Sequence, residues 1–87
     1  MREVKVGAIY RHFKGNYYYV EDVAYDSETM ERMVVFRPLF DRGDGKNLWV
    51  RSEAMFLSDI PKRADNITGQ TIRFEYQEDF AKDHRNK

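Results

Sequence analysis

A short turn between two aromatic segments constrains the fold of this chain most strongly. Residues 7–13 are rich in apolar and aromatic side chains, and a second such run covers residues 17–25. Residues 14–16 lie between them, and Gly15 can adopt the positive φ angles that tight turns require. Aromatic and β-branched residues favour strands. The segment therefore predicts a β-hairpin that turns at Gly15.

The second arm of this hairpin does not alternate regularly. Tyr18 and Val20 share one face, but the next apolar residue is Val23. Such a change of phase indicates a β-bulge at residues 21–22, and a bulge bends its strand. Strongly bent strands allow a short sheet to curl into a small barrel.

Further strands and one helical turn follow the hairpin. Pro38 cannot donate a ladder hydrogen bond, so the third strand bends or lies at an edge there. Ser52 is a suitable N-cap for a turn at residues 53–56 that directs Met55 and Phe56 into the core. The pattern predicts a mainly β fold: a five-stranded SH3-like barrel with one short helical or 3-10 turn. The expected strands cover residues 7–13, 17–25, 32–40, 47–51 and 71–76, and the expected loops cover residues 26–31, 41–46 and 61–70.

Composition narrows the class of protein. The 87 residues suffice for one domain, and we assign residues 1–76 to it and residues 77–87 to a flexible tail. The chain has no cysteine, no N-terminal apolar run and no segment apolar enough to cross a membrane, so we expect a cytoplasmic protein without a signal peptide. Fifteen basic and fifteen acidic residues are mixed along the chain, which leaves room only for a local basic patch.

Several short sequence blocks indicate how the chain is related to other proteins. They cover residues 10–15, 27–29, 34–36, 49–51 and 73–75. These blocks resemble a bacterial and phage family of small proteins known as domain of unknown function 1653. The resemblance implies a small β-barrel-like fold and implies no activity. Two positions depart from the family pattern: Asp26 stands where members often carry histidine, and Ser52 stands where proline usually follows Trp-Val-Arg.

The charged hairpin is the first candidate binding site. Arg11, His12 and Lys14 lie around its turn, and an arginine fork suits phosphate or carboxylate groups. Strand alternation places Arg11 and Phe13 on one face and His12 and Lys14 on the other. The structural alternative is that Phe13 enters the core, Arg11 pairs with an acid such as Glu28, and the other two side chains face water.

Aromatic residues extend this candidate site. Tyr17 is expected on the outside of the sheet, where it offers a recognition surface or simply favours the strand. Trp49 and Arg51 share one strand face, which is the outer one if Leu48 and Val50 point inward. A tryptophan beside an arginine can stack on a base, a sugar or a proline. In the alternative interpretation Trp49 fills the core and Arg51 holds a loop.

Polar loop residues complete the candidates. Glu28 and Thr29 can bind a ligand or stabilise their own turn. His12 with Glu28 is the one pair that suggests acid–base chemistry, but no nucleophile motif accompanies it, so we assign no catalytic residue. The two histidines, His12 and His84, lie far apart in the sequence, so we expect no metal site and no cofactor.

These features lead to three hypotheses. The first is a non-catalytic binding module for an anionic nucleotide-like or nucleic-acid ligand. The second is a protein- or peptide-interaction module of the SH3-like type, and the third is a small enzyme that uses His12 and Glu28. We expect no membrane partner, and exposed strand edges are compatible with a monomer or a homodimer. The first hypothesis uses Arg11, His12, Lys14, Tyr17, Glu28, Thr29, Trp49 and Arg51.

Overall fold

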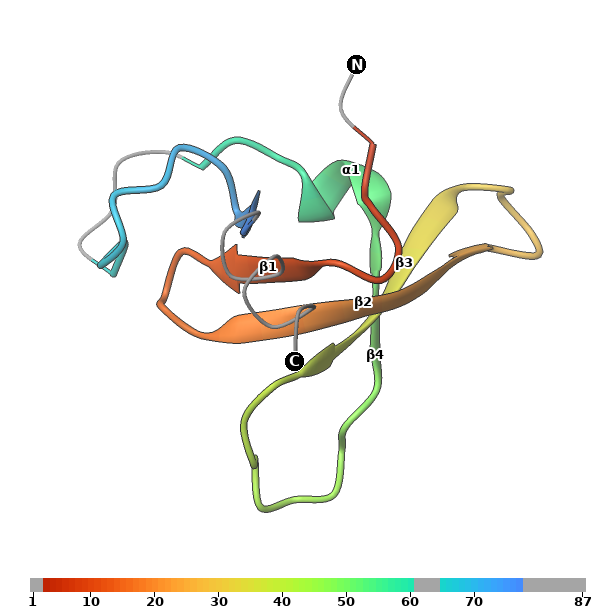
Figure 1. Ribbon diagram of the computed structural model, residues 1–87. Helices are drawn as coiled ribbons and strands as arrows, with labels where there is room; N and C mark the ends of the chain where they lie inside the picture. The colour runs from red at the N-terminus through yellow and green to blue at the C-terminus, as the bar shows by residue number, and fades with distance from the viewer. Residues whose placement is uncertain (1–2, 61–64, 78–87) are drawn as a thin grey trace.

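The structure is a computed structural model that describes residues 3–60 and 65–77 (Figure 1). The predicted tail at residues 77–87, except Gln77, lies outside the described residues, as do His84 and residues 61–64 of the predicted loop. The predicted mainly β class, with five strands and one short helix, is confirmed. Within the described residues the elements are β1 (Ile9–His12), β2 (Tyr17–Tyr25), β3 (Arg32–Pro38), β4 (Trp49–Ser52), α1 (Glu53–Phe56) and β5 (Phe74–Tyr76).

All five strands belong to one antiparallel sheet in the order β4-β3-β2-β1-β5. The edge strands β4 and β5 share no ladder in the described part of the chain, so the sheet is open and is not closed into the predicted barrel. An isolated bridge between Asp59 and Ile72 joins the segment after α1 to the segment before β5. No helix in residues 3–60 or 65–77 is long and apolar enough to cross a membrane.

A bulge bends the long central strand. The pairing of β2 with β3 shifts register between Val20 and Asp22, as the sequence predicts. Figure 1 shows that β3 and β4 consequently run across the direction of β1. Pro38 lies beyond Phe36, the last residue of β3 that pairs with β4, so its missing N–H leaves no gap in that ladder. The bend gives the sheet a concave face.

The predicted turn between β1 and β2 is confirmed. Gly15 has a φ of 110°, a conformation that side-chain-bearing residues rarely adopt. Its N–H donates to the carbonyl of His12 at 2.8 Å, and the His12 N–H donates to the carbonyl of Asn16 at 2.8 Å. These bonds close the hairpin and set the register in which Arg11 faces Tyr17.

The core on the concave face is largely aromatic. The rings of Phe56 and Phe74 stack with centroids 4.1 Å apart, and Phe36 and Tyr10 meet Phe56 edge to face at 5.3 and 5.2 Å. Phe56 is completely buried, whereas Met55 is 48 % exposed. The prediction that both residues enter the core is therefore wrong, because one helical turn directs only one of two adjacent side chains inward.

A polar cluster ties α1 to the rest of the fold. Ser52 caps the helix as predicted, since its Oγ accepts the N–H of Met55 at 3.2 Å. Arg32 donates to Glu53 from Nε at 2.9 Å and from Nη2 at 3.1 Å, and the Val4 N–H donates to the same carboxylate at 3.1 Å. The bonds from Arg32, together with that from Val4, lower the pKa of Glu53.

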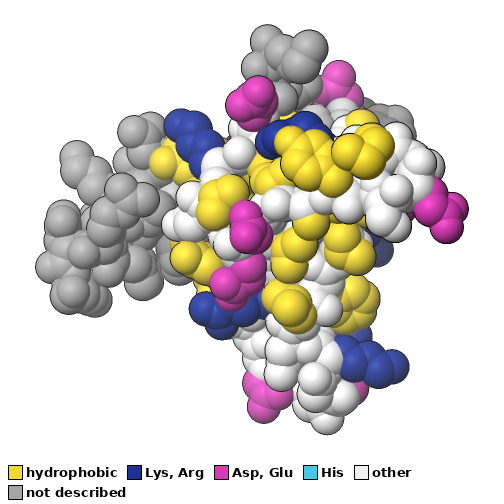
Figure 2. Space-filling view, turned by 90° about the vertical axis from the view of Figure 1, so that its right-hand side faces the viewer, with side chains coloured by type: hydrophobic (Ala, Val, Ile, Leu, Met, Phe, Trp, Pro, Cys, Tyr) yellow, Lys and Arg dark blue, Asp and Glu magenta, His cyan; other side chains and the backbone are white. Residues whose placement is uncertain are grey.

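The surface mixes side chains of every type. Figure 2 shows apolar, acidic and basic side chains interspersed on one face, with no continuous basic area. This pattern agrees with the balanced charge of the sequence. The large apolar residues that are exposed include Val6, Tyr25, Met30, Leu48, Val50 and Ile67.

Candidate functional site

One small pocket on the concave face collects residues from every strand. Its volume is about 110 Å³. It is formed where the bend of the sheet brings side chains of β4 toward β5. We call it the aromatic–arginine pocket, and its lining residues are His12, Tyr18, Phe36, Arg42, Trp49, Arg51 and Phe74.

Aromatic rings form the walls of the aromatic–arginine pocket. Tyr18 meets Phe36 and Phe74 edge to face, with centroids 5.6 and 5.5 Å apart. The His12 ring packs against Phe74 at 4.8 Å in the same manner. Burial raises the pKa of Tyr18, so its hydroxyl stays protonated at neutral pH. Interlocked rings of this kind give the pocket a defined shape.

His12 is neutral at pH 7 and retains one N–H donor. Burial lowers the pKa of His12 to about 4, and the positive charges of Arg51, Arg73 and Lys14 act in the same direction. The Nδ1 atom accepts the backbone N–H of Lys14 at 3.1 Å. In the neutral ring the proton therefore resides on Nε2, which can donate a hydrogen bond.

Arg51 brings a positive charge to the pocket. No carboxylate of residues 3–60 or 65–77 lies within ion-pair distance of it. Arg32, in contrast, is held by Glu53. The Arg51 guanidinium lies 5.9 Å from the ring centroid of Phe74. Its planar fork is therefore available for a carboxylate or phosphate group.

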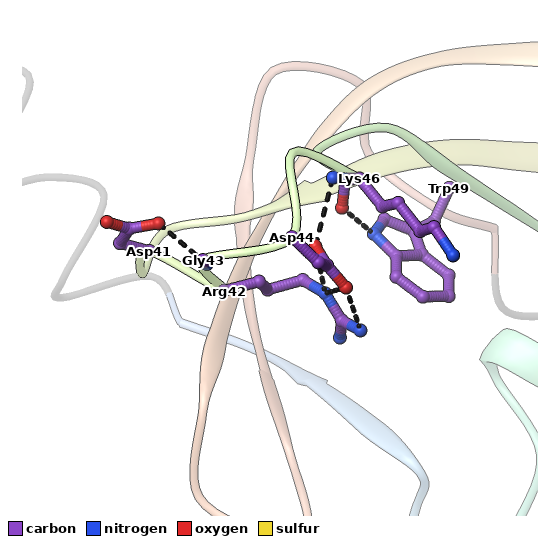
Figure 3. A network of polar contacts seen from close by, with 6 residues as sticks. All are labelled: Asp41, Arg42, Gly43, Asp44, Lys46 and Trp49. Atoms are coloured by element: carbon purple, nitrogen blue, oxygen red, sulfur yellow. Dashed lines mark hydrogen bonds and ion pairs between the residues drawn. The ribbon is translucent and has the colours of Figure 1, made fainter.

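Arg42 lines the pocket from the loop between β3 and β4, and Figure 3 shows it in that loop with Asp44 and Trp49. Its guanidinium lies 4.4 Å from the ring centroid of Trp49, and its Nη2 pairs with Asp44 at 3.0 Å. Asp44 also accepts the N–H of Lys46 at 3.0 Å, and the indole Nε1 of Trp49 donates to the Lys46 carbonyl at 2.8 Å. The loop thus holds Arg42 and Trp49 together.

These features make the pocket suitable for an anion that carries a flat ring. Two guanidinium groups supply positive charge, and none of the lining residues is acidic. The aromatic faces can stack on a planar group. The lining offers His12 no carboxylate to orient it and no serine, threonine or cysteine nucleophile. The arrangement therefore favours recognition over acid–base catalysis.

Three predicted site residues, His12, Trp49 and Arg51, meet in this pocket. The prediction that Trp49 and Arg51 share a face is right, and the condition under which that face would be the outer one is not met. Leu48 and Val50 are 65 % and 59 % exposed, while Trp49 and Arg51 line the concave side. The reason is the strand register, which pairs Trp49 with a buried phenylalanine of β3.

Three other predicted residues do not line the pocket. Arg11 donates from Nε to the carbonyl of Gly15 at 3.1 Å and lies 5.1 Å from the ring centroid of Tyr17. Strand alternation puts this pair on the face opposite His12. The Lys14 ammonium lies 3.7 Å from Asp65 and acts on the pocket only through its charge.

Glu28 and Thr29 lie in the exposed loop between β2 and β3, at the opposite end of β3 from the Arg42 loop. The Asp26 carboxylate accepts the N–H of Glu28 at 2.8 Å and that of Thr29 at 3.0 Å. The N–H groups of Thr29 and Glu28 lower the pKa of Asp26. These bonds match the turn-stabilising interpretation, and the length of β2 separates Glu28 from His12.

Sequence reasoning missed four residues of the pocket: Tyr18, Phe36, Arg42 and Phe74. Arg42 lies in a segment that was correctly predicted as a turn. The residues that favour a turn do not determine the direction in which a long side chain extends. One sequence feature could have predicted the position of Arg42: a short glycine-rich loop separates it from the single tryptophan, and arginine commonly stacks on tryptophan. Tyr18 shares a strand face with the buried Val20, and it packs against the core while it also lines the pocket.

Other parts of the described surface offer less specific chemistry. A hollow of about 650 Å³ lies beside the loop between β3 and β4, but its Arg37 is engaged by Glu21. A mainly apolar hollow of about 300 Å³ lies beside Tyr10 and Tyr76. Within the described ranges, no three His, Cys, Asp or Glu side chains are grouped so that they could hold a metal ion.

Comparison with known protein families identifies the relatives of this chain. The profile of the family described as "Protein of unknown function (DUF1653)" matches residues 8–76. The chain belongs to this family. A solved structure shows the same fold: the crystal structure of a DUF1653 protein from Bordetella bronchiseptica has a TM-score of 0.71 at 28 % identity and covers 88 % of this chain and 91 % of that chain. No curated protein matches.

Membership in DUF1653 confirms the resemblance identified from the sequence blocks. The matched residues 8–76 include all five strands and the whole lining of the aromatic–arginine pocket. The pocket therefore lies within the part of the chain that defines the family.

Proposed function

We propose that this protein is a non-catalytic binding module for an anionic, nucleotide-like or nucleic-acid-derived ligand, held in the aromatic–arginine pocket. Arg51 and Arg42 bind the anionic group, the neutral His12 donates one hydrogen bond, and Trp49 provides a face for stacking a ring. A domain without cysteine suits the cytoplasm, where we expect it to act.

The observation that supports this proposal most directly is the environment of Arg51. A half-buried guanidinium costs free energy to desolvate, and that cost is normally offset by a carboxylate. Among the described residues no carboxylate does so for Arg51. A bound anion would supply the missing partner.

Binding can be followed directly, because Trp49 is the single tryptophan of the chain and lines the pocket. We expect adenosine 5′-monophosphate to change its fluorescence in a saturable way. Arg51→Gln should weaken this binding about tenfold or more, because charged hydrogen bonds to the anion are lost. Arg11→Gln is the matched control: it removes the same charge from the opposite face and should leave binding unchanged.

A second candidate function is an SH3-like module that binds an extended peptide. Its support is the edge strand β4, where Val50 is 59 % exposed and the neighbouring Leu48 is 65 % exposed. Exposed apolar residues on a free strand edge can accept a peptide strand. Such binding should survive Arg51→Gln, whereas binding of an anion should not.

A further inference from the structure

We infer that the aromatic–arginine pocket recognises a single terminal phosphate monoester on a nucleoside, and not the internal phosphates of a nucleic-acid strand. This inference rests on the proposed function and deepens it, because it names the chemical group that enters the pocket. The free mononucleotide and the phosphorylated end of a strand present the same group, and the experiment below separates them.

The size of the pocket is the first argument. Its volume is about 110 Å³, whereas pockets that enclose a drug-sized ligand measure roughly 300–1,000 Å³. Only a head group can enter. A phosphate monoester has one substituent and can enter with three free oxygens, while a diester carries a substituent on each side and needs an open groove.

The placement of charge is the second argument. Proteins that follow a strand line a groove with cations along the backbone. Among the described cations outside the pocket, Arg32, Arg37 and Lys14 form ion pairs with Glu53, Glu21 and Asp65. In the pocket, Arg51 forms no ion pair with a described carboxylate, and Arg42, although paired with Asp44, brings a second guanidinium to the same point instead of to a groove.

The donor arrangement is the third argument. A phosphate monoester carries a charge of about −1.5 to −2 at pH 7 and accepts several hydrogen bonds. Asp44 engages the Nε and Nη2 atoms of Arg42, which leaves the Nη1 donors of that guanidinium. Together with Arg51 and the neutral His12, these donors suit an acceptor with three oxygens.

The position of Trp49 is the fourth argument. The side chain is 37 % exposed, so part of the ring remains open to a ligand outside the pocket. Its Nε1 is held by the Lys46 carbonyl, and this bond fixes the orientation of the ring. A phosphate in the pocket would place an attached nucleoside close to this ring, where a base can stack.

The test is a titration of the intact protein, followed by Trp49 fluorescence and by calorimetry. The four probes are adenosine, adenosine 5′-monophosphate, and a short single-stranded oligonucleotide with and without a 5′-phosphate. We expect each phosphorylated probe to bind about tenfold or more tightly than its unphosphorylated counterpart. Binding should weaken only slightly with salt, since few charged contacts form. A free-mononucleotide site would bind the monophosphate alone, and an end-recognition site would also bind the phosphorylated strand.

Equal binding of both oligonucleotides, with a steep dependence on salt and on strand length, would overturn the inference. The proposed function would stand if Arg51→Gln abolished that binding. Absence of any binding that depends on Arg51 would overturn both. Arg42→Gln provides a second variant in an exposed loop, and it should also reduce the preference for the phosphorylated probes.

Discussion

At the scale of the residue, His12 illustrates how packing changes the role of a side chain. An exposed histidine titrates near pH 6.5. Burial against Phe13 and Phe74, together with neighbouring cations, lowers the pKa of His12 to about 4. His12 is therefore a neutral hydrogen-bond donor at pH 7, whereas the sequence suggested acid–base chemistry together with Glu28.

This lowered pKa predicts how stability depends on pH. Between pH 6.5 and 4 the unfolded chain binds more protons at His12 than the folded protein does, so stability falls as the pH falls. Above pH 6.5 both states are neutral and His12 has no effect. His12→Asn keeps an acceptor for the Lys14 N–H and does not titrate. It should reduce the loss of unfolding free energy between pH 7 and pH 5 by about 1 kcal/mol, a value discounted for partial solvent exposure.

Urea unfolding at the two pH values measures this effect. His84→Asn is the control, because it removes the other histidine of the chain. An unchanged pH dependence in His12→Asn, or a reduction only in His84→Asn, would show that His12 does not have a lowered pKa.

At the scale of the element, helix α1 and the loop between β3 and β4 each depend on one carboxylate for their geometry. Glu53 joins α1 to β3 through Arg32 and to the N-terminal segment through the N–H of Val4. Asp44 holds Arg42 within the loop between β3 and β4. Neither helix nor loop is long enough to be stable by its own backbone bonds, so these side-chain bonds fix their geometry.

Loss of the Glu53 charge should destabilise the fold. The side chain is 14 % exposed and accepts three hydrogen bonds. We expect Glu53→Gln to lower the free energy of unfolding by about 1–2 kcal/mol, measured by urea unfolding at pH 7. Glu21→Gln breaks an exposed ion pair with Arg37 and should cost at most about 0.5 kcal/mol. Equal losses in both variants would contradict this account.

The contacts in the loop between β3 and β4 lead to a prediction about ligand binding. Asp44 competes with any anion for Arg42, so Asp44→Asn should strengthen binding of adenosine 5′-monophosphate roughly threefold while its Oδ1 still accepts the Lys46 N–H. Asp41→Asn is the control, because Asp41 accepts the Gly43 N–H and has no bond to Arg42. If Asp44→Asn weakened binding instead, Asp44 would position Arg42 for the ligand and would not compete with it.

At the scale of the whole molecule, an aromatic core supports an open sheet. Phe56 from α1 and Phe74 from β5 stack at the centre, and Phe74 also lines the aromatic–arginine pocket. Core and pocket thus share a wall. The edges β4 and β5 do not pair within the described residues, so this stack, together with the bridge between Asp59 and Ile72, connects the helix with the far strand of the sheet.

Removal of one ring from this stack should be costly. Phe56→Ala is expected to lower the free energy of unfolding by about 3–5 kcal/mol, since it deletes a fully buried side chain and leaves a cavity. A small domain has a low free energy of unfolding, so the midpoint of urea unfolding should move to a much lower urea concentration. Met55→Ala, at the exposed neighbouring position, should change stability by about 0.5 kcal/mol or less. Similar losses in both variants would contradict the observed orientation of α1.

The sequence by itself determined the local features of this protein. The turn at Gly15, the bulge in β2 and the cap at Ser52 follow from properties of neighbouring residues, and the structure confirms all three. Local rules suffice for them because φ angles, strand alternation and caps act over a few residues.

Only the tertiary structure decided which side chains form the candidate site. Alternation shows that Trp49 and Arg51 share a face, but the packing of α1 on the sheet and the bend of the sheet determine that this face is the concave one. The same packing brings Arg42 to the pocket and leaves Glu28 at the other end of β3. Contacts between residues distant in sequence depend on the bend and the order of the strands, and no local pattern specifies where a long loop side chain meets them.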